Sequence, residues 1–190
     1  YELISGYKDE SILLRHHAPD NVTEIHEFNR FTGETKVLAS HKDATLGTLM
    51  DNDWNVIGYT TNIDKPKRHY FDLNSKAAAF HQLLNKSFAG KYARVSSETK
   101  DGSLSVITVS SDKEPGTYYL YDHNKKKLSI LHKQRESISR DRFHTMRPID
   151  FTARDGLKIH GYLTTPNDFT YPGPMVLLVH GGPFGPRDRW

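Results

Sequence analysis

The sequence predicts a mainly β protein, with about three blades of a partial β-propeller over residues 1–146 and a different unit over residues 147–190. Three observations support this prediction. Aromatic residues are frequent, with ten Tyr and nine Phe among 190 residues, and such residues favour strands. A set of sequence markers recurs three times before residue 147, and the pattern of the chain changes after that point.

Each repeat opens with an acidic turn that leads into a run of strand-forming residues. The turns are Asp9–Ser11, Asp51–Asp53 and Lys100–Gly102, and the runs that follow them are Ile12–Leu14, Val56–Thr60 and Leu104–Val109. A loop with one proline comes next, at Pro19, Pro66 and Pro115. An alternating strand then ends in an aromatic residue followed by Asp or Asn, at Phe28–Asn29, Phe71–Asp72 and Tyr121–Asp122.

The spacing of these markers favours propeller blades. The prolines lie 47 and 49 residues apart and the aromatic residues 43 and 50 apart, close to the 40–50 residues of one blade. A single four-stranded meander buries only part of its faces, so blades stack and share a core. The alternative is an ordinary antiparallel sheet with similar hairpins.

A further strand is expected at the end of each repeat. Its apolar residues are Val37 and Leu38, then Phe80 and Leu83, then Leu128 with Ile130 and Leu131. The second of these segments, Lys76–Asn85, contains three consecutive alanines, so its helix propensity also allows a short helix. Propellers usually have four to eight blades, so we expect further blades on the N-terminal side and self-association of this piece through its open sheet edges.

After residue 147 the pattern predicts a hairpin and then a buried strand. Ile149–Thr152 and Ile159–Leu163 alternate on either side of Asp155 and Gly156, a strong turn signal because Gly accepts positive φ. The continuous apolar run Met175–Val179 is typical of a strand buried on both faces of an α/β sheet. It leads directly into His180–Pro183.

The two motifs together, Phe151–Leu163 and Val179–Phe184, resemble the opening of the catalytic domain in the prolyl oligopeptidase family. The likeness is strongest to the acylaminoacyl-peptidase and dipeptidyl-aminopeptidase branches. It implies an α/β-hydrolase domain that begins at residue 147, behind a β-propeller. It also implies a parent serine peptidase that hydrolyses short peptides through an acyl-enzyme. The specific motifs lie in about the last 40 residues.

The resemblance also suggests a role for the two glycines after the apolar run. Acyl transfer builds negative charge on the carbonyl oxygen, and fixed backbone N–H groups stabilise that charge. In α/β-hydrolases one of these donors comes from the loop that follows such a strand. The resemblance places it at Gly182, with Gly181 as the second candidate. A simple turn that ends a strand is the alternative. We expect His180 to position the loop, and Asp188 to form a salt bridge with Arg187 or Arg189.

No catalytic nucleophile is recognisable in these residues. The pattern G-x-S-x-G, which places the nucleophilic serine on a strand-to-helix turn, does not occur. In α/β-hydrolases the serine, acid and histidine follow the oxyanion loop in that order. We therefore expect the triad to lie past Trp190, the chain to be a fragment truncated before the nucleophile, and the chain alone to be inactive.

Composition argues against several other classes of protein. With no cysteine, disulfides and thiolate chemistry are excluded, although the compartment, cytoplasmic or periplasmic, stays open. The net charge is only +3, and Lys125–Lys127 is expected to be a solvated hairpin tip, so nucleic-acid binding is not predicted. Met175–Val179 is too short to span a membrane. None of the eleven histidines shows a known metal-ligand spacing, and His16–His17 is expected to be solvated, so no metal or cofactor is predicted.

Two other functions stay open. One is a non-catalytic propeller module that binds proteins or peptides and keeps a degenerate hydrolase tail. The other is an esterase-like hydrolase on the same scaffold that acts on non-peptide substrates. The sequence after Trp190 would distinguish the binding module from the peptidase. A comparison of peptide and ester substrates would distinguish the esterase-like hydrolase from the peptidase.

Overall fold

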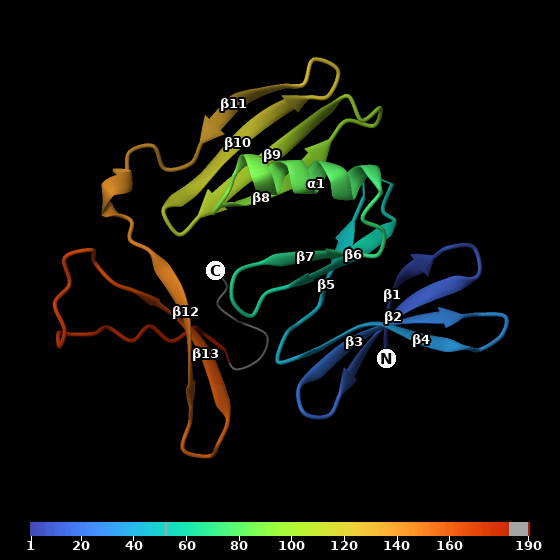
Figure 1. Cartoon of the computed structure of the whole chain (residues 1–190), viewed down its shortest axis with the longest axis horizontal. Helices are drawn as coiled ribbons and strands as arrows, with labels where there is room; N and C mark the ends of the chain where they lie inside the picture. The colour runs from blue at the N-terminus through green and yellow to red at the C-terminus, as the bar shows by residue number, and fades with distance from the viewer. Residues whose placement is uncertain (52, 183–189) are drawn as a thin grey trace.

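The computed structural model describes residues 1–51, 53–182 and 190. Figure 1 shows three antiparallel sheets that follow one another along the chain, a helix against the third sheet, and a long two-stranded hairpin. The protein is therefore mainly β. In every sheet the strands lie in the order of the sequence or its reverse, so each sheet is a simple up-and-down meander.

The sheets differ in their number of strands. The first contains β1 (Glu2–Tyr7), β2 (Ser11–Ala18), β3 (Val22–Asn29) and β4 (Thr35–Lys42). The second contains β5 (Gly47–Met50), β6 (Val56–Thr61) and β7 (Lys67–Tyr70). The third contains β8 (Tyr92–Glu98), β9 (Leu104–Ser111), β10 (Glu114–Asp122) and β11 (Lys127–Lys133).

The repeated sequence markers occupy equivalent places in the three sheets. The acidic turns join the first strand of each sheet to the second, and the aromatic markers stand at or just after the end of the third strand. The Asp or Asn of each pair accepts hydrogen bonds from backbone N–H groups of the following turn. Asn29 accepts from Phe31 and Thr32, Asp72 from Asn74, and Asp122 from Lys125, at 2.8–3.0 Å. These side chains cap the turns, which explains why the pair recurs.

Two features of the repeat differ from the predicted strands and loops, and for the first of them the short helix was the stated alternative. The expected last strand of the second repeat is a helix, α1 (Lys76–Ser87), and its N-cap Ser75 accepts a hydrogen bond from Ala78 N–H at 3.2 Å. An N-cap serine and an alanine-rich first turn favour a helix over a strand. Pro115 does not lie in a loop but is the second residue of β10, beside a register shift between Glu114 and Thr117. Proline is tolerated there because a bulge interrupts the ladder.

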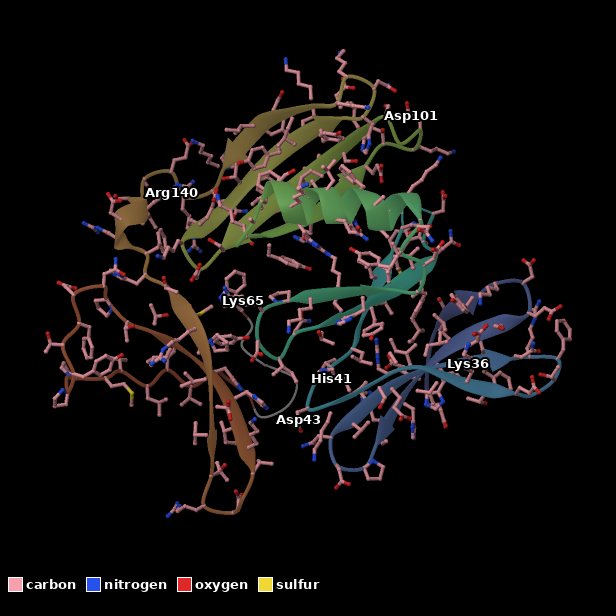
Figure 2. The ribbon with its side chains drawn as sticks, viewed as in Figure 1. Lys36, His41, Asp43, Lys65, Asp101 and Arg140 are labelled. Carbon is pink, nitrogen blue, oxygen red and sulfur yellow. The ribbon has the colours of Figure 1, made fainter. Side chains whose placement is uncertain are left out.

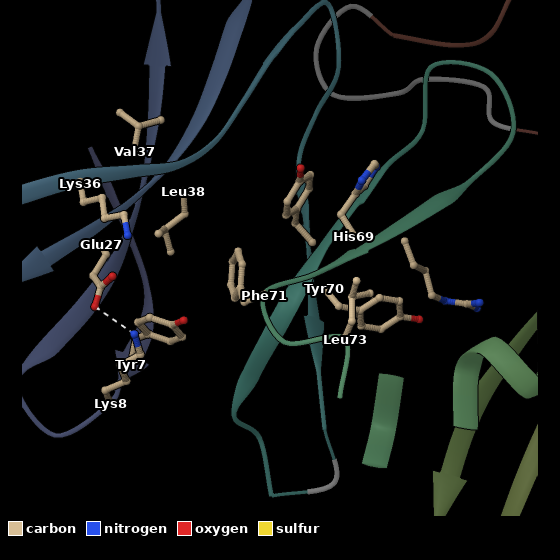
Figure 3. Close-up of a pocket in the computed structure, with 12 residues that line it drawn as sticks. Tyr7, Lys8, Glu27, Lys36, Val37, Leu38, His69, Tyr70, Phe71 and Leu73 are labelled. Carbon is tan, nitrogen blue, oxygen red and sulfur yellow. Dashed lines mark ion pairs between the residues drawn. The ribbon is translucent and has the colours of Figure 1, made fainter. Parts of the chain in front are cut away.

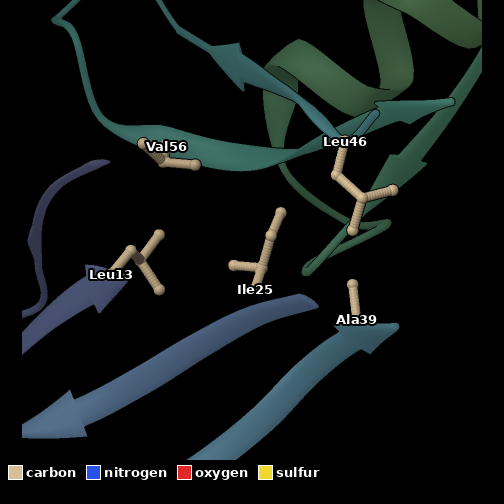
Figure 4. Close-up of a cluster of buried hydrophobic side chains, with 5 residues drawn as sticks. All are labelled: Leu13, Ile25, Ala39, Leu46 and Val56. Carbon is tan, nitrogen blue, oxygen red and sulfur yellow. The ribbon is translucent and has the colours of Figure 1, made fainter. Parts of the chain in front are cut away.

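A core forms where the first sheet faces the second. Its buried side chains are Leu13, Ile25 and Ala39 from β2, β3 and β4, with Leu46 just before β5 and Val56 of β6 (Figure 4). Leu13, Ile25 and Leu46 are fully buried. Removing each such side chain from water contributes about 1.5–3 kcal/mol. This shared core holds the first and second sheets together.

A second core lies between α1 and the third sheet. Leu84 of α1 packs with Ala93 of β8 and with Ile107 and Val109 of β9. Figure 1 shows α1 lying across this sheet. The helix therefore covers a face that the third sheet would otherwise expose. No helix within the described residues is long and apolar enough to cross a membrane.

The predicted hairpin after residue 147 is confirmed. Strand β12 (Met146–Thr152) pairs with β13 (Lys158–Thr164) from one end to the other without a register shift. Gly156 in the turn has φ of 85°, a conformation that L side chains rarely adopt. A short 3-10 turn, η1 (Arg140–Arg142), lies between β11 and this hairpin.

The prediction for Met175–Val179 was wrong. This segment forms no strand, and its side chains are 74–93% exposed. A strand buried on both faces needs neighbours on both sides, and among the described residues none pairs with it. The described residues form neither a closed propeller nor an α/β-hydrolase sheet; they form three meander sheets and a hairpin.

Candidate functional site

The candidate oxyanion loop follows the exposed apolar run. Gly181 and Gly182 are both exposed, and a Cβ atom added at Gly181 would meet no heavy atom within 4 Å. Nδ1 of His180 lies 2.8 Å from the Gly181 carbonyl oxygen, a contact within the loop itself. The backbone here is open enough for a substrate to approach. Residues 183–189, with Pro183, Phe184 and the expected Asp188 salt bridges, lie outside the described residues.

One serine–histidine pair elsewhere in the molecule has the elements of a catalytic site but the wrong geometry. Oγ of Ser105 lies 2.7 Å from Nε2 of His123, and Oε1 of Glu98 lies 3.7 Å from the same nitrogen. A triad acid must instead bind the other ring nitrogen, so that it orients the base. Ser105 is also fully buried. This pair therefore cannot attack a substrate, and we assign it to the packing of the third sheet.

A large groove separates the second sheet from the third. Its volume is about 1070 Å³, and β5, β6, α1, β8 and the β8–β9 turn contribute to its walls. Charged side chains of both signs line it: Arg68, Lys76, Arg94 and Lys100, and Asp51, Asp53, Glu98 and Asp101. Figure 2 labels Asp101 at the tip of the β8–β9 hairpin. A groove of this kind suits a ligand that carries both charges.

Arg68 lines this groove. Its guanidinium donates to the carbonyl oxygen of Ala93 and, at 3.1 Å, to Oδ1 of Asn85, and it lies 4.6 Å from the centre of the Tyr92 ring. These contacts join β7 to α1 and β8. Arg68 therefore holds the second and third sheets together at the point where the groove separates them.

Burial shifts the pKa values of two groups near Arg68, and hydrogen bonds shift that of a third group at the outer end of the groove. Burial, and next the charge of Arg68, lowers the pKa of His81 to about 4, so His81 is neutral at neutral pH. Nδ1 of His81 lies 3.1 Å from the Tyr70 hydroxyl, and burial raises the pKa of that hydroxyl. At the outer end of the groove, hydrogen bonds from Thr99 and Ser103 lower the pKa of Asp101 to about 2. The groove thus keeps a permanent anion at its rim.

A smaller groove lies between the first and second sheets (Figure 3). Its volume is about 660 Å³. Lys8 and Glu27 form an ion pair of 3.6 Å on the first-sheet side. On the other side the rings of Tyr59 and His69 stack, with their centres 4.6 Å apart. Burial lowers the pKa of His69, so the positive charge on this wall at neutral pH comes from Arg68.

The hairpin is fixed to the sheets by a few polar contacts. The Tyr162 hydroxyl donates to the Asp64 carbonyl oxygen at 2.7 Å and lies 3.3 Å from that of Ile63. The N–H of Met146 donates to Oδ2 of Asp112 at 2.9 Å. Lys65, labelled in Figure 2 on the β6–β7 turn, lies over the ring of Trp190 at 4.6 Å. These junction contacts set the direction in which β12 and β13 leave the sheets.

The structure also brings together three residues that the sequence analysis did not connect. His16, Glu24 and His26 converge on one face of the first sheet, and of the expected solvated pair only His17 is exposed. The three-residue loop Pro19–Asn21 could have revealed this cluster, because the length of a hairpin loop sets the register of its two strands. Such a loop pairs His16 with Glu24 and places His26 two residues further along β3.

Comparison with known proteins points to peptidases. No family model matches the chain. The chain is 32% identical to dipeptidyl aminopeptidase BIII of Pseudoxanthomonas mexicana over half of this chain and 15% of that protein. It is 29% identical to dipeptidyl peptidase family member 6 of Caenorhabditis elegans, over 83% of this chain and 25% of that protein. The chain spans a quarter or less of these relatives. Both similar proteins are dipeptidyl peptidases by name.

Proposed function

We propose that this chain is part of a serine peptidase that hydrolyses short peptides through an acyl-enzyme, in the acylaminoacyl-peptidase or dipeptidyl-peptidase branch. One observation carries the proposal: the hairpin β12–β13, the apolar run and His180–Pro183 follow three meander sheets in the order that the resemblance implies. The names of the two similar proteins agree with it. In this proposal the hydrolase unit begins at residue 147.

Within this peptidase, Gly182 donates its backbone N–H to the oxyanion of the tetrahedral intermediate, and Gly181 is the second candidate. Glycine suits this position because the backbone can approach the substrate without a Cβ atom in the way. Loss of one such donor typically lowers turnover by about 10²–10³-fold. The nucleophile, the acid and the base are supplied by residues outside positions 1–190, because the chain has no G-x-S-x-G pattern.

The sheets act as the gate that screens peptides before they reach the catalytic centre. The groove between the second and third sheets supports this role, because both cationic and anionic side chains line it. A short peptide carries one positive and one negative end at neutral pH. The same groove favours the second candidate function, a module that binds peptides without hydrolysing them.

Hydrolysis assays test the proposal. The chain alone is expected to release no product from a dipeptidyl p-nitroanilide or from p-nitrophenyl acetate above a buffer blank. Turnover by the chain that a serine-directed inhibitor abolishes would contradict it. In the natural protein, faster hydrolysis of the anilide than of matched simple esters supports the peptidase, and the reverse preference favours the esterase-like alternative.

The role of the two glycines is tested in the natural protein by Gly182→Pro and Gly181→Pro, since proline removes the N–H donor. The substitution at the true donor position is expected to lower kcat by about 10²–10³-fold with a smaller change in KM. Thermal unfolding of each variant controls for misfolding. If both variants have the same kcat as the unmodified protein, neither glycine N–H stabilises the oxyanion.

Self-association through open sheet edges is a further part of the proposal. Strand β11 pairs only with β10 among the described strands, and Ile130 and Leu131 on it are more than half exposed. An unpaired apolar edge can add a strand from a second copy. Light scattering is expected to show association that Ile130→Lys reduces. A clean monomer at high concentration would contradict this part.

A further inference from the structure

The first sheet carries two histidines and a glutamate whose polar atoms converge. His16 lies on β2 directly opposite Glu24 on β3, and His26 is two residues further along β3. Oε2 of Glu24 lies 3.2 Å from Nδ1 of His16 and 2.8 Å from Nε2 of His26. All three atoms lie within 4.8 Å of one another.

The β2–β3 ladder beneath these side chains is regular, and on its other side β3 pairs with β4 through a register shift between Ile25 and His26. Strands β2 and β3 pair continuously from Ser11 and Asn29 to Ala18 and Val22, with no register shift. Side chains alternate between the two faces of a strand, and Leu13 and Ile25 occupy the opposite face, inside the first core. The cluster therefore projects from a rigid hairpin, on the face turned away from the second sheet.

We propose that His16, Glu24 and His26 form a binding site for one divalent transition-metal ion of the zinc class. Two imidazoles and one carboxylate are ligands that zinc accepts, whereas Mg²⁺ and Ca²⁺ prefer all-oxygen sites. Ligand atoms around a tetrahedral zinc ion lie about 3.3 Å apart, and the distances from Glu24 to both rings are already close to this value. Three protein ligands leave a fourth position for water.

The surroundings favour a metal cation. The Glu24 carboxylate lies between the two imidazole rings, within hydrogen-bonding distance of a nitrogen of each. The Ser40 hydroxyl donates to the second carboxylate oxygen at 3.3 Å, which helps to fix its orientation. The ring of Tyr1 stacks on His16 with its centre 4.5 Å away and meets His26 edge-on at 5.5 Å. These contacts limit the rotation of both imidazoles.

One feature limits the affinity. Nδ1 of His26 is buried and has no hydrogen-bond partner in the described part of the chain. Metal-bound histidines normally donate their second N–H to a carboxylate, carbonyl or water, and losing such a partner costs about 10–100-fold in affinity. We therefore expect binding weaker than in a structural zinc site, yet selective for zinc over magnesium.

Isothermal titration of the whole chain at pH 7.5, after treatment with EDTA and desalting, tests the site. ZnCl₂ is expected to bind with a stoichiometry of one, and MgCl₂ to give no binding heat. Glu24→Gln and His16→Ala are each expected to weaken zinc binding by at least about tenfold. His17→Ala is the matched control, because His17 is adjacent to His16 in the chain but exposed and on the other face of β2.

Thermal unfolding separates loss of binding from loss of folding. Zinc is expected to raise the midpoint of the unmodified chain and of His17→Ala, and to raise that of Glu24→Gln by a smaller amount. His16 is partly exposed, so His16→Ala is expected to fold and keeps the test valid if variants of buried His26 do not. The proposal is overturned if the unmodified chain binds no zinc, if Glu24→Gln binds it equally well, or if His17→Ala loses as much affinity as His16→Ala.

Discussion

Strand β9 and the segment Met175–Val179 both carry large aliphatic side chains but place them in different environments. In β9, Ile107 and Val109 are completely buried, whereas every side chain of Met175–Val179 is at least 74% exposed. Strand β9 has β8 on one side, β10 on the other and α1 across one face. Met175–Val179 has no pairing strand among the described residues. An apolar run thus indicates a tendency to be buried, and neighbouring elements decide whether burial occurs.

The largest expected effect contrasts these two segments directly. Ile107→Ala removes a fully buried side chain and is expected to lower the free energy of unfolding by about 2–5 kcal/mol. Leu178→Ala, at a position that is 86% exposed, is expected to change it by less than about 0.5 kcal/mol. Urea denaturation measures both. Equal destabilisation by the two substitutions would mean that the apolar run is packed in solution.

A second pair of substitutions compares close packing with open space inside the sheets. A Cβ atom at Gly58 in β6 would overlap the carbonyl oxygen of His69 in β7, whereas one at Gly6 in β1 would meet nothing within 4 Å. Gly58→Ala is therefore expected to cost about 1–3 kcal/mol or more. Gly6→Ala serves as the control and is expected to have little effect. If thermal unfolding gives the same midpoint for both variants, the register of β6 and β7 is wrong.

A third prediction concerns the anchor between the third sheet and the linker to the hairpin. The buried carboxylate of Glu114 accepts hydrogen bonds from Lys91 and Thr117 and pairs with Arg140, which Figure 2 labels in η1. Burial acts to raise the pKa of Glu114, but the hydrogen bonds from Lys91 and Thr117 outweigh it, and the net shift is downward. Glu114→Gln is expected to cost about 1–3 kcal/mol at pH 7.

The pH dependence gives this prediction a second readout. Because the pKa of Glu114 is lower in the folded state, its contribution is complete above the unfolded value near 4.5 and is lost as the pH falls through the folded value. Unfolding measured from pH 7 to pH 3 should show the difference between the unmodified chain and Glu114→Gln shrinking below pH 4.5. A difference that stays constant over this range would contradict the assignment.

The smallest expected effect tests how the hairpin is attached. Tyr162→Phe removes the hydroxyl that donates to the Asp64 carbonyl oxygen and is expected to cost about 0.5–1.5 kcal/mol. Tyr171→Phe is the matched control, because Tyr171 is 65% exposed. Hydrogen exchange of β12 and β13 should be faster in Tyr162→Phe alone. No difference between the two variants would show that this contact does not hold the hairpin.

The sequence was most informative where structure is decided locally. The acidic turns, the aromatic–Asx pairs and the Asp155–Gly156 turn each depend on residues close together in the chain, and all lie where they were predicted. The last element of the second repeat was less certain, because apolar residues Phe80 and Leu83 fit a strand while Ser75 and the alanines fit a helix. The helix formed because its buried residues pack on the third sheet.

Features that depend on distant residues were not predictable in the same way. Strand β5 is only four residues long and shows no strong pattern of its own. The cluster of His16, Glu24 and His26 depends on the register of a hairpin, and the groove at Arg68 depends on how two sheets face each other. For the candidate oxyanion loop, the resemblance identified Gly181 and Gly182 as candidate donors, and that role stays a prediction.

The sequence of the natural protein beyond Trp190, read together with its intact mass, tests the central claim most directly. We predict a G-x-S-x-G pattern within roughly a hundred residues, followed by an acidic residue and a histidine in that order. A natural protein that ends at Trp190, or one in which the serine is replaced, would contradict the peptidase and make a peptide-binding module the better description.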